Sequence, residues 1–197
     1  VNGFPGQASV RPNLSLGDTL AGQQAALGAV LALLARERGG TGQVVDASIV
    51  EAVFGVLEGV LPEYSGAGAV RGPSGSSVSG IVPTGTYECG DGVSVVIGAN
   101  SDSLFARLAD VMGTPRFADP EYIGNERRVA RQEEIDGAIG QWTASLPSCE
   151  VLAALDDAEI PNGKIYSIAD IAEDPHVQER GMFETITVAE EGMESYE

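Results

Sequence analysis

Hydrophobic positions recur at helical spacing in the longest patterned stretch of the chain, which runs from Gly17 to Arg38. The spacing places four leucines on one stripe of a helix, and small alanines beside them would let another element approach closely. Cations near the end of the stretch suit the negative end of a helix dipole, and Gly39-Gly40 predicts the stop. The pattern therefore predicts one long apolar helix. Its leucine stripe consists of Leu20, Leu27, Leu31 and Leu34.

A strand and a second helix are expected directly after this helix. Residues 42–47 are typical of a short buried strand. Ser48 and Glu51 form a Ser-x-x-Glu capping box ahead of an apolar run. The box predicts a helix from Ile49 to about Leu61, which Pro62 would end. Helix, strand and helix at this spacing favour an α/β layer with a parallel sheet.

Hydrophobic periodicity disappears over residues 65–85, where Gly, Ser and Pro dominate. Such a composition indicates a loop or linker and marks the best candidate for a domain boundary. The segment is either a flexible connector or a mobile glycine-rich lid that covers an active site. Composition alone leaves both interpretations open.

The second half of the chain favours a small α+β domain. Asp91-Gly92 between two strand-like segments predicts a β-hairpin. Serines that precede apolar runs predict helix N-termini further on. The expected elements after the hairpin are a helix capped by Ser101, a helix over 127–143, a helix capped by Ser148, a strand at 163–166, short helices at 167–172 and 175–180, and a strand at 182–188.

These elements predict a four-part organisation. Residues 1–65 are expected to form part of a large α/β domain, and residues 66–85 the Gly/Ser/Pro-rich loop or linker. Residues 86–166 are expected to form the small α+β domain. Residues 167–197 would return toward the large domain.

Composition and charge limit the classes of partner. The formal net charge is −18, which argues against nucleic acid and against anionic membrane surfaces as partners. Cys89 and Cys149 lie too far apart for a metal knuckle or a disulfide framework, and His176 is the one histidine, so no metal is expected. No apolar run reaches the length of a membrane span, and no secretory signal opens the chain. A cytoplasmic protein is expected.

Asp18 is the first candidate for chemistry. It lies at or next to the N-cap of the predicted long helix. Backbone N–H groups and the positive end of the helix dipole favour a negative charge there. Most aspartates at such positions only cap the helix, so the local chemistry does not separate a cap from a nucleophile.

The order of several motifs resembles the class III CoA-transferase family, which includes formyl-CoA transferases and carnitine CoA-transferases. The motifs are GDTLAG, a leucine- and alanine-rich helix, and RERGGTGQVVDASIVEAVF. The resemblance continues through GTYECGDGVSVVIGANSDSLFARL and IYSIADIAEDPHVQERGMF and covers nearly the whole chain. It implies an α/β fold in which the first part belongs to a Rossmann-like parallel-sheet large domain. Family members are longer, which implies a fragment that lacks the N-terminal half, where most CoA-binding residues lie.

The resemblance implies transfer of coenzyme A between carboxylic acids. Asp18 would be the nucleophile that passes through an aspartyl-CoA thioester, because a carboxylate can attack a thioester and become one. Gly17 would let substrate come close, since it has no side chain. In the related racemase branch, a glutamate in a Tyr-Glu context like that of Glu88 contributes to the active site. The nearest matches to the glycine motif of the family's loop are Gly72, Gly75 and Gly80.

Acyl-CoA and a carboxylic acid are the expected substrates, with no permanently bound cofactor and with an interlocked homodimer in the full-length protein. One alternative is an α-methylacyl-CoA racemase on the same fold, in which Asp18 would act as an acid/base. The other is a non-catalytic subunit or fragment that needs a partner chain for the CoA site. CoA phosphates need cations or helix N-termini, and 11 Lys and Arg in the chain are few.

Overall fold

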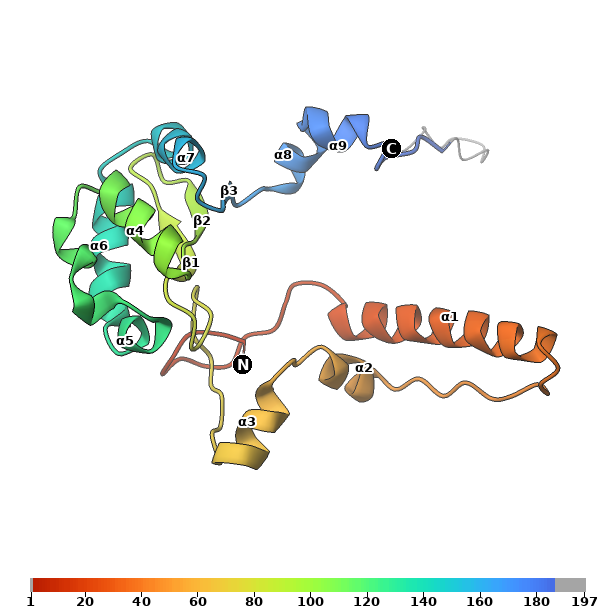
Figure 1. Cartoon of the computed structure of the whole chain (residues 1–197). Coiled ribbons are helices and arrows are strands. Elements are labelled where there is room, and N and C mark those ends of the chain that lie inside the picture. The colour runs from red at the N-terminus through yellow and green to blue at the C-terminus, as the bar shows by residue number, and fades with distance from the viewer. Residues whose placement is uncertain (1, 187–197) are drawn as a thin grey trace. The chain divides into compact units, whose positions relative to one another are not determined.

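A computed structural model describes residues 2–186 of the chain (Figure 1). The chain divides between Ser79 and Gly80 into two compact units. Unit 1 contains helices α1 (Leu16–Glu37), α2 (Ile49–Gly55) and α3 (Val60–Ala67). Unit 2 contains the β-sheet and the remaining helices. The mixed helix and sheet character expected from the sequence is confirmed.

The long helix α1 ends where the sequence predicts. Gly39 adopts φ +93°, and its backbone N–H donates to Arg36 O at 3.1 Å. Gly40 N–H donates to Ala35 O at 3.0 Å. These two hydrogen bonds satisfy carbonyl groups of the last turn, and glycine adopts the positive φ at little energetic cost.

The predicted helix over residues 49–61 is wrong in its second half. Its start is confirmed, because Ser48 Oγ accepts a hydrogen bond from Glu51 N at 3.4 Å. However, α2 ends at Gly55, and Pro62 lies in the first turn of α3 instead of ending a helix. Proline is tolerated there because the N–H groups of a first turn have no helical acceptor.

The predicted strand at 42–47 is not formed in the described part of the chain. The segment has no strand partner there, and Val44 is 93% exposed. A strand exists only through hydrogen bonds to a neighbour, so apolar pattern alone does not produce one. The one sheet of the described residues is antiparallel, and the Rossmann-like parallel sheet is not seen in them.

The sheet of unit 2 has the strand order β1-β2-β3, built from β1 (Thr84–Glu88), β2 (Ser94–Gly98) and β3 (Asn162–Lys164). The predicted hairpin is confirmed, with Glu88 opposite Ser94 and Gly92 at φ +80° in the turn. β3 pairs with β2, with Val95 opposite Lys164. It begins one residue before and ends two residues before the strand expected at 163–166.

Helices pack on this sheet, and further short helices come after β3 in the sequence. Ser101 caps α4 as predicted, since its Oγ accepts from Leu104 N at 3.2 Å. The helix expected over 127–143 is two helices, and Ser148 is the first residue of its helix, whose N-cap is Pro147. Both short C-terminal helices are confirmed. The bounds are α4 (Asp102–Val111), the short 3₁₀ helices η1 (Pro115–Ala118) and η2 (Pro120–Tyr122), α5 (Asn125–Val129), α6 (Gln132–Ala144), α7 (Ser148–Asp157), α8 (Ile168–Glu173) and α9 (Pro175–Glu179). The strand expected at 182–188 lies partly outside the described residues.

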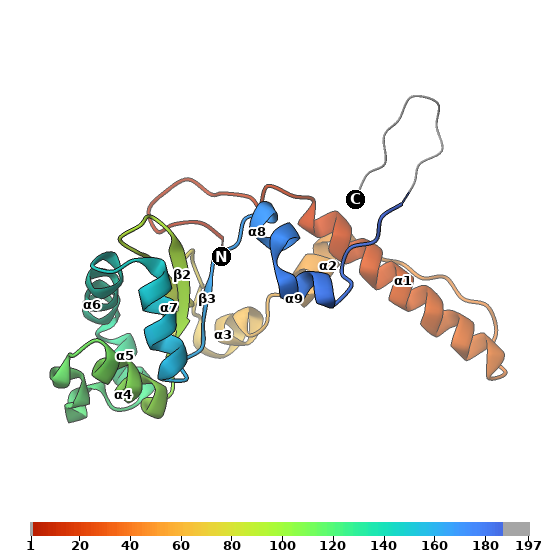
Figure 2. The same ribbon diagram turned by 90° about the horizontal axis from the view of Figure 1, so that it is seen from above.

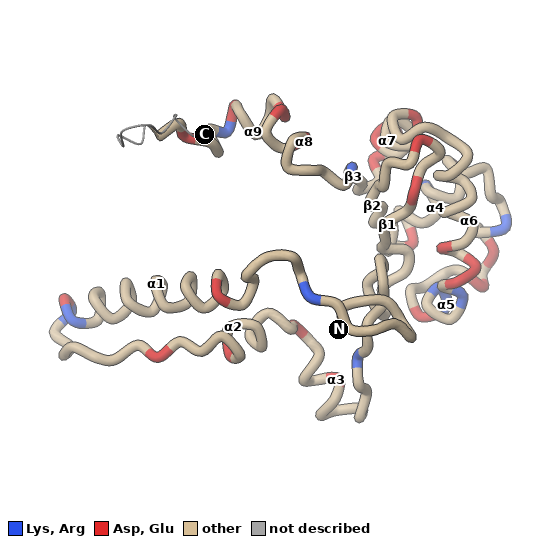
Figure 3. Tube along the Cα trace, turned by 180° about the vertical axis from the view of Figure 1, so that it is seen from behind, with Lys and Arg blue, Asp and Glu red and all other residues tan. Residues whose placement is uncertain are grey.

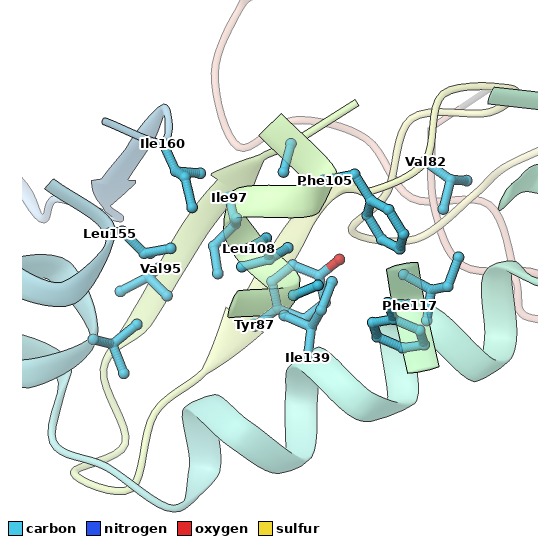
Figure 4. Close-up of a cluster of buried hydrophobic side chains, with 14 of the residues drawn as sticks. Val82, Tyr87, Val95, Ile97, Phe105, Leu108, Phe117, Ile139, Leu155 and Ile160 are labelled. Atoms are coloured by element: carbon cyan, nitrogen blue, oxygen red, sulfur yellow. The ribbon is translucent and has the colours of Figure 1, made fainter. Parts of the chain in front are cut away.

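Unit 2 has a continuous hydrophobic core (Figure 4). Alternate residues of the hairpin, such as Val95 and Ile97, face helices α6 and α7, which lie on one side of the sheet (Figure 2). Leu108 of α4, Ile139 of α6 and Leu155 of α7 meet them at helical spacing. The inward-facing residues of the strands, at every second position, and those of the helices, at helical spacing, therefore form one core.

Unit 1 buries far less. Ala52 is the one buried hydrophobic residue among its described residues, while Leu27 is 60% and Leu31 55% exposed. Between Asp18 and Arg36, α1 carries no charge (Figure 3). At 22 residues and a mean hydropathy of 1.2, α1 is long and apolar enough by length and composition to cross a membrane, contrary to the sequence expectation. Core helices of soluble proteins share these properties.

Candidate active site

Asp18 lies in the first turn of α1. The N-cap is Ser15, so Asp18 is the third helical residue, slightly deeper than the predicted position at or next to the cap. The first helical hydrogen bond runs from Thr19 N to Ser15 O at 3.0 Å. The backbone N–H groups of residues 16–18 therefore precede the helical ladder, and the positive end of the dipole lies around Asp18.

The Asp18 carboxylate is exposed and does not cap the helix. No side chain forms a capping hydrogen bond at this end of α1. Among residues 2–186, no hydrogen bond or ion pair engages the Asp18 carboxylate. Both oxygens are thus available to an incoming group, which is what a nucleophilic carboxylate requires.

Gly17 makes room for a neighbouring helix. A Cβ at this position would lie 2.8 Å from Ile49 Cγ2 and 3.5 Å from Val53 Cγ2 of α2. Gly28, three turns further along the same face of α1, would place a Cβ 2.7 Å from Val45 Cγ1. Close packing of α1 on residues 45–53 thus needs both glycines. This role was not predicted for Gly17, and substrate approach there stays a prediction.

The leucine stripe of α1 is separate from this contact face. Apart from Leu20, the less exposed positions of α1 are small residues, whereas the leucine stripe lies roughly a third of a turn away around the helix. Close approach through small residues is therefore seen, at Gly17 and Gly28, while Leu27, Leu31 and Leu34 of the leucine stripe stay exposed within the described chain. The small-residue positions are Gly17, Ala21, Ala25, Gly28 and Ala32.

The glycines of the loop over 66–85 differ in their surroundings. Gly72 has no heavy atom near its would-be Cβ. Gly75, at φ +70°, lies against Phe4, and its N–H donates to Gly3 O at 2.9 Å, so unit 1 holds it. Gly80, at φ +79°, is the first residue of unit 2, and its carbonyl accepts from Asn125 Nδ2 at 2.8 Å.

Glu88 is the last residue of β1, in unit 2, and its side chain is exposed. Its backbone carbonyl accepts from Thr143 Oγ1 at 2.9 Å. The adjacent Tyr87 is buried, and its hydroxyl donates to Asp136 Oδ1 at 2.6 Å. Burial and this hydrogen bond raise the pKa of Tyr87, which keeps the phenol protonated. Asp18 and Glu88 belong to different units, so the geometry within either unit does not join them.

Unit 1 contains four arginines and no lysine, and one of them, Arg11, lies in the segment before α1, where its Nε donates to Pro12 O at 3.4 Å. Arg36 and Arg38 lie at the far end of α1, about 30 Å from Asp18 by the rise of a helix. Arg71 forms an ion pair with Glu63, whose Oε2 accepts from Arg71 Nε at 3.0 Å, and this hydrogen bond raises the pKa of Arg71. Arg71 also borders an apolar cavity of about 290 Å³. The cavity is lined by Phe54, Val60, Leu61, Tyr64, Ala69, Val70 and Arg71.

Metal-ligand residues are dispersed. In the part of the chain that the structure describes, no group of three or more His, Cys, Asp or Glu side chains is placed to hold an ion. Cys89 is buried and Cys149 exposed, both as free thiols. His176 is an exposed residue near the start of α9, as predicted, and its backbone N–H donates to Asp174 Oδ1 at 2.8 Å.

Sequence reasoning missed a polar cluster at α5. Arg128 is 1% exposed and Asn125 is partly buried, and both bond to the backbone at the end of the glycine-rich loop. Their partners lie 26 to 46 residues away in sequence, apart from Tyr122. No local sequence pattern predicts such contacts. The one signal in the sequence is that Arg128 occupies a position where helical spacing predicts an apolar residue.

Residues 1–196 match the family model described as CoA-transferase family III. The succinyl-CoA–D-citramalate CoA-transferase of Chloroflexus aurantiacus is 39% identical over 177 residues, which are 89% of this chain and 44% of that protein. The alpha subunit of the succinyl-CoA–L-malate CoA-transferase of Chloroflexus aurantiacus is 37% identical over 186 residues, 93% of this chain and 44% of that protein. The chain thus spans less than half the length of these relatives.

Solved structures share the fold. A CAIB/BAIF family protein from Brucella suis is 26% identical with a TM-score of 0.76, over 94% of this chain and 49% of that one. Rv3272 from M. tuberculosis gives a TM-score of 0.80 at 18% identity, over 98% of this chain and 50% of that one.

Proposed function

Since the chain belongs to CoA-transferase family III, we propose that the complete protein transfers coenzyme A between carboxylic acids, with Asp18 as the nucleophile. The family match confirms the resemblance read from the sequence. The observation that carries the proposal is the exposed, unengaged carboxylate of Asp18 in the first turn of α1. Asp18 is also the aspartate of the GDTLAG motif on which the resemblance rests.

The reaction proceeds in two halves. An oxygen of the Asp18 carboxylate attacks the acyl carbon of the donor, the C–S bond breaks, and CoA leaves as a thiolate while an aspartyl–acyl anhydride forms. The thiolate then attacks the aspartyl carbon and expels the donor acid as a carboxylate, which leaves an aspartyl-CoA thioester. The acceptor carboxylate runs the same steps in reverse and regenerates Asp18.

The start of α1 supports this chemistry. Each attack on the aspartyl carbon places negative charge on its oxygen. The N–H groups of residues 16–18 precede the helical ladder, and donors of this kind stabilise an oxyanion. The dipole of a 22-residue helix adds a fixed positive field at the same end.

We infer that the acceptor is a small dicarboxylic acid and that succinyl-CoA is the donor. Relatives are named for succinyl-CoA with D-citramalate, L-malate or mesaconate, and another is named an acetyl-CoA:oxalate CoA-transferase. Each named acceptor carries two carboxylates. One carboxylate can exchange CoA with Asp18, and the second needs a cation for recognition.

The remainder of the complete protein is proposed to supply what this chain lacks. A charge of −18 repels the phosphates of CoA, so cations from outside these residues would bind them. The same remainder, or a second subunit of an interlocked homodimer, would cover the leucine stripe of α1. Relatives include alpha and beta subunits of one CoA-transferase, which is consistent with assembly from more than one chain. A cytoplasmic location fits these soluble acyl-CoA substrates.

The decisive experiment uses the full-length protein. It is incubated with succinyl-CoA, treated with hydroxylamine, and digested for peptide mass spectrometry. An aspartyl hydroxamate at Asp18 is expected, and Asp18→Ala should lose both it and the transfer activity. Asp46→Ala is the matched control, because Asp46 is another exposed carboxylate of unit 1.

Two other results would replace the proposal. Exchange of the substrate's α-proton with solvent, without a hydroxamate, would establish the racemase. A protein that binds no CoA and forms no adduct would be a non-catalytic subunit.

A further inference from the structure

We propose that Asn125 and Arg128 of α5, together called the α5 anchor, are positioning residues that fix the end of the glycine-rich loop during CoA transfer. The inference rests on the proposed function for its catalytic consequence. The anchor itself is a set of contacts within unit 2 and is tested separately.

Asn125 binds two backbone groups of the loop end with its single amide. Its Nδ2 donates to Gly80 O at 2.8 Å, and its Oδ1 accepts from Val82 N at 3.0 Å. A side-chain amide that both donates and accepts replaces the partner strand that this backbone lacks. The backbone from Gly80 to Val82 is therefore held at two points by one residue.

Arg128 holds the same segment from the buried side. Its Nε donates to Val82 O at 2.9 Å and its Nη2 donates to Asn100 O at 2.6 Å. Its Nη1 donates to Asp102 Oδ1 at 2.5 Å, and the guanidinium carbon lies 5.1 Å from the ring centre of Phe105. Figure 4 shows Val82 and Phe105 at the same end of the core cluster. The backbone N–H and C=O of Val82 thus both form hydrogen bonds with side chains of α5.

The burial of Arg128 makes this arrangement a specific one. A cation taken out of water is tolerated only where its donors are satisfied. Arg128 uses four donor contacts, and three of them go to backbone carbonyls of separate segments. A planar fork can reach these acceptors together, whereas the ammonium of lysine cannot.

The loop is held in unit 1 only a few residues upstream. Gly75 N donates to Gly3 O, and Ser74 and Ser77 exchange hydrogen bonds from their hydroxyls to each other's carbonyls, at 2.6 and 3.1 Å. The division between the units falls directly after Ser79. Two residues, Val78 and Ser79, separate that turn from the anchored segment. The anchor therefore determines where the loop leaves unit 2.

A fixed loop end is most important while the enzyme carries the aspartyl-CoA thioester. Water competes with the acceptor: its oxygen attacks the aspartyl carbon, the C–S bond breaks, CoA leaves as the thiol, and the Asp18 carboxylate and one proton are released. A loop that closes over the intermediate excludes water and preserves transfer. The ratio of hydrolysis to transfer therefore reports on the loop and is independent of how much enzyme is active.

The test compares Asn125→Ala with Glu126→Ala in the full-length protein. Glu126 is an exposed neighbour in α5. Hydrogen exchange of the peptide that contains Val82 should rise about 5-fold to 30-fold in Asn125→Ala, as expected for the loss of one to two net hydrogen bonds. The hydrolysis-to-transfer ratio with succinyl-CoA should rise severalfold, and Glu126→Ala should match the wild type in both measurements. Arg128→Lys, which keeps the charge beside Asp102, should change both in the same direction.

Unchanged exchange at Val82 in Asn125→Ala would overturn the anchor. Faster exchange with an unchanged hydrolysis-to-transfer ratio would overturn its positioning role. A wild-type protein that transfers no CoA would instead refute the proposed function, and the exchange measurement would still decide whether Asn125 holds the loop.

Discussion

At the scale of single residues, Gly17 couples the nucleophile to the packing of unit 1. A Cβ there would lie 2.8 Å from Ile49 Cγ2, so α1 and α2 must separate to admit it. We expect Gly17→Ala to lower the free energy of unfolding of the full-length protein by about 1–3 kcal/mol, the usual cost of overpacking. It should also impair CoA transfer, since Asp18 is the next residue. Denaturant unfolding and a transfer assay measure the two effects.

Gly22→Ala is the control for this substitution. Gly22 lies in the same helix and has no heavy atom within 4 Å of its would-be Cβ. Alanine there should stabilise α1 by up to about 1 kcal/mol through helix propensity. Equal effects of the two substitutions would show that α1 and α2 are not in close contact in the complete protein.

Asp102 links the α5 anchor to pH. Its Oδ1 accepts from Arg128 Nη1 and from Gly124 N, and these hydrogen bonds hold the pKa of Asp102 below its ordinary value. A carboxyl whose pKa is lower in the folded state contributes stability above its unfolded pKa, near 3.9. That contribution is lost as the pH falls through the folded pKa.

We therefore expect Asp102→Asn to be less stable than the wild type at pH 7, with a gap that closes as the pH falls below about 4. Denaturant unfolding between pH 2.5 and pH 7 measures the gap. Asp110→Asn, in the same helix and exposed, is the control for removing one negative charge from α4. A gap that stays constant over this range would mean that the charge of Asp102 does not contribute.

Residues differ in how far the sequence predicts their role. Asp18 could be placed at a helix start because the apolar period, the GDTLAG motif and the Gly39-Gly40 stop are all local. Gly17 lies in the first turn of α1, but its contact with Ile49 could not be predicted because it depends on how a second helix packs. Arg128 was missed because its burial is created by partners far away in sequence.

At the scale of elements, α1 presents two distinct faces. The small-residue face packs on residues 45–53, while most of the leucine stripe is exposed, with Leu31 55% accessible. An apolar stripe of this size is covered in a stable soluble protein. Residues outside this chain are the proposed cover.

We expect Leu31→Glu to make the full-length protein insoluble or to lower its free energy of unfolding by more than about 3 kcal/mol, since a charge would be buried without a partner. Ala26→Glu is the control, because Ala26 is exposed and belongs to neither face of α1. Soluble yield and thermal unfolding separate the two variants. Equal tolerance would show that the leucine stripe faces solvent in the complete protein.

Elements whose signals are local were predicted well. The Asp91-Gly92 hairpin, the Ser48 and Ser101 caps and the end of α1 each depend on a few neighbouring residues. The strand expected at 42–47 failed because pairing needs a neighbour that the described chain does not provide. The helix expected to end at Pro62 failed because proline suits a first turn as well as a helix end.

At the scale of the whole molecule, charge opposes compactness. The chain carries 29 acidic and 11 basic side chains, which gives a net charge of −18. Such an excess repels itself, and salt shortens the reach of the repulsion from about 30 Å at 0.01 M to about 8 Å at 0.15 M. The chain has one lysine, Lys164, whose Nζ forms an ion pair with Asp170 Oδ1 at 2.6 Å.

Salt should therefore stabilise unit 2, the unit that has a core of its own. Its ion pairs are mostly at the surface, where each contributes little to stability. The stability lost when salt screens these pairs is therefore smaller than the stability gained when salt screens the net repulsion. We expect the unfolding midpoint to rise as NaCl increases from 0.01 to 0.5 M, followed by the fluorescence of Trp142, which packs against that core. Sucrose at matched osmolality controls for exclusion effects that do not depend on charge. A midpoint that falls with salt would mean that attraction within the ion pairs outweighs the net charge.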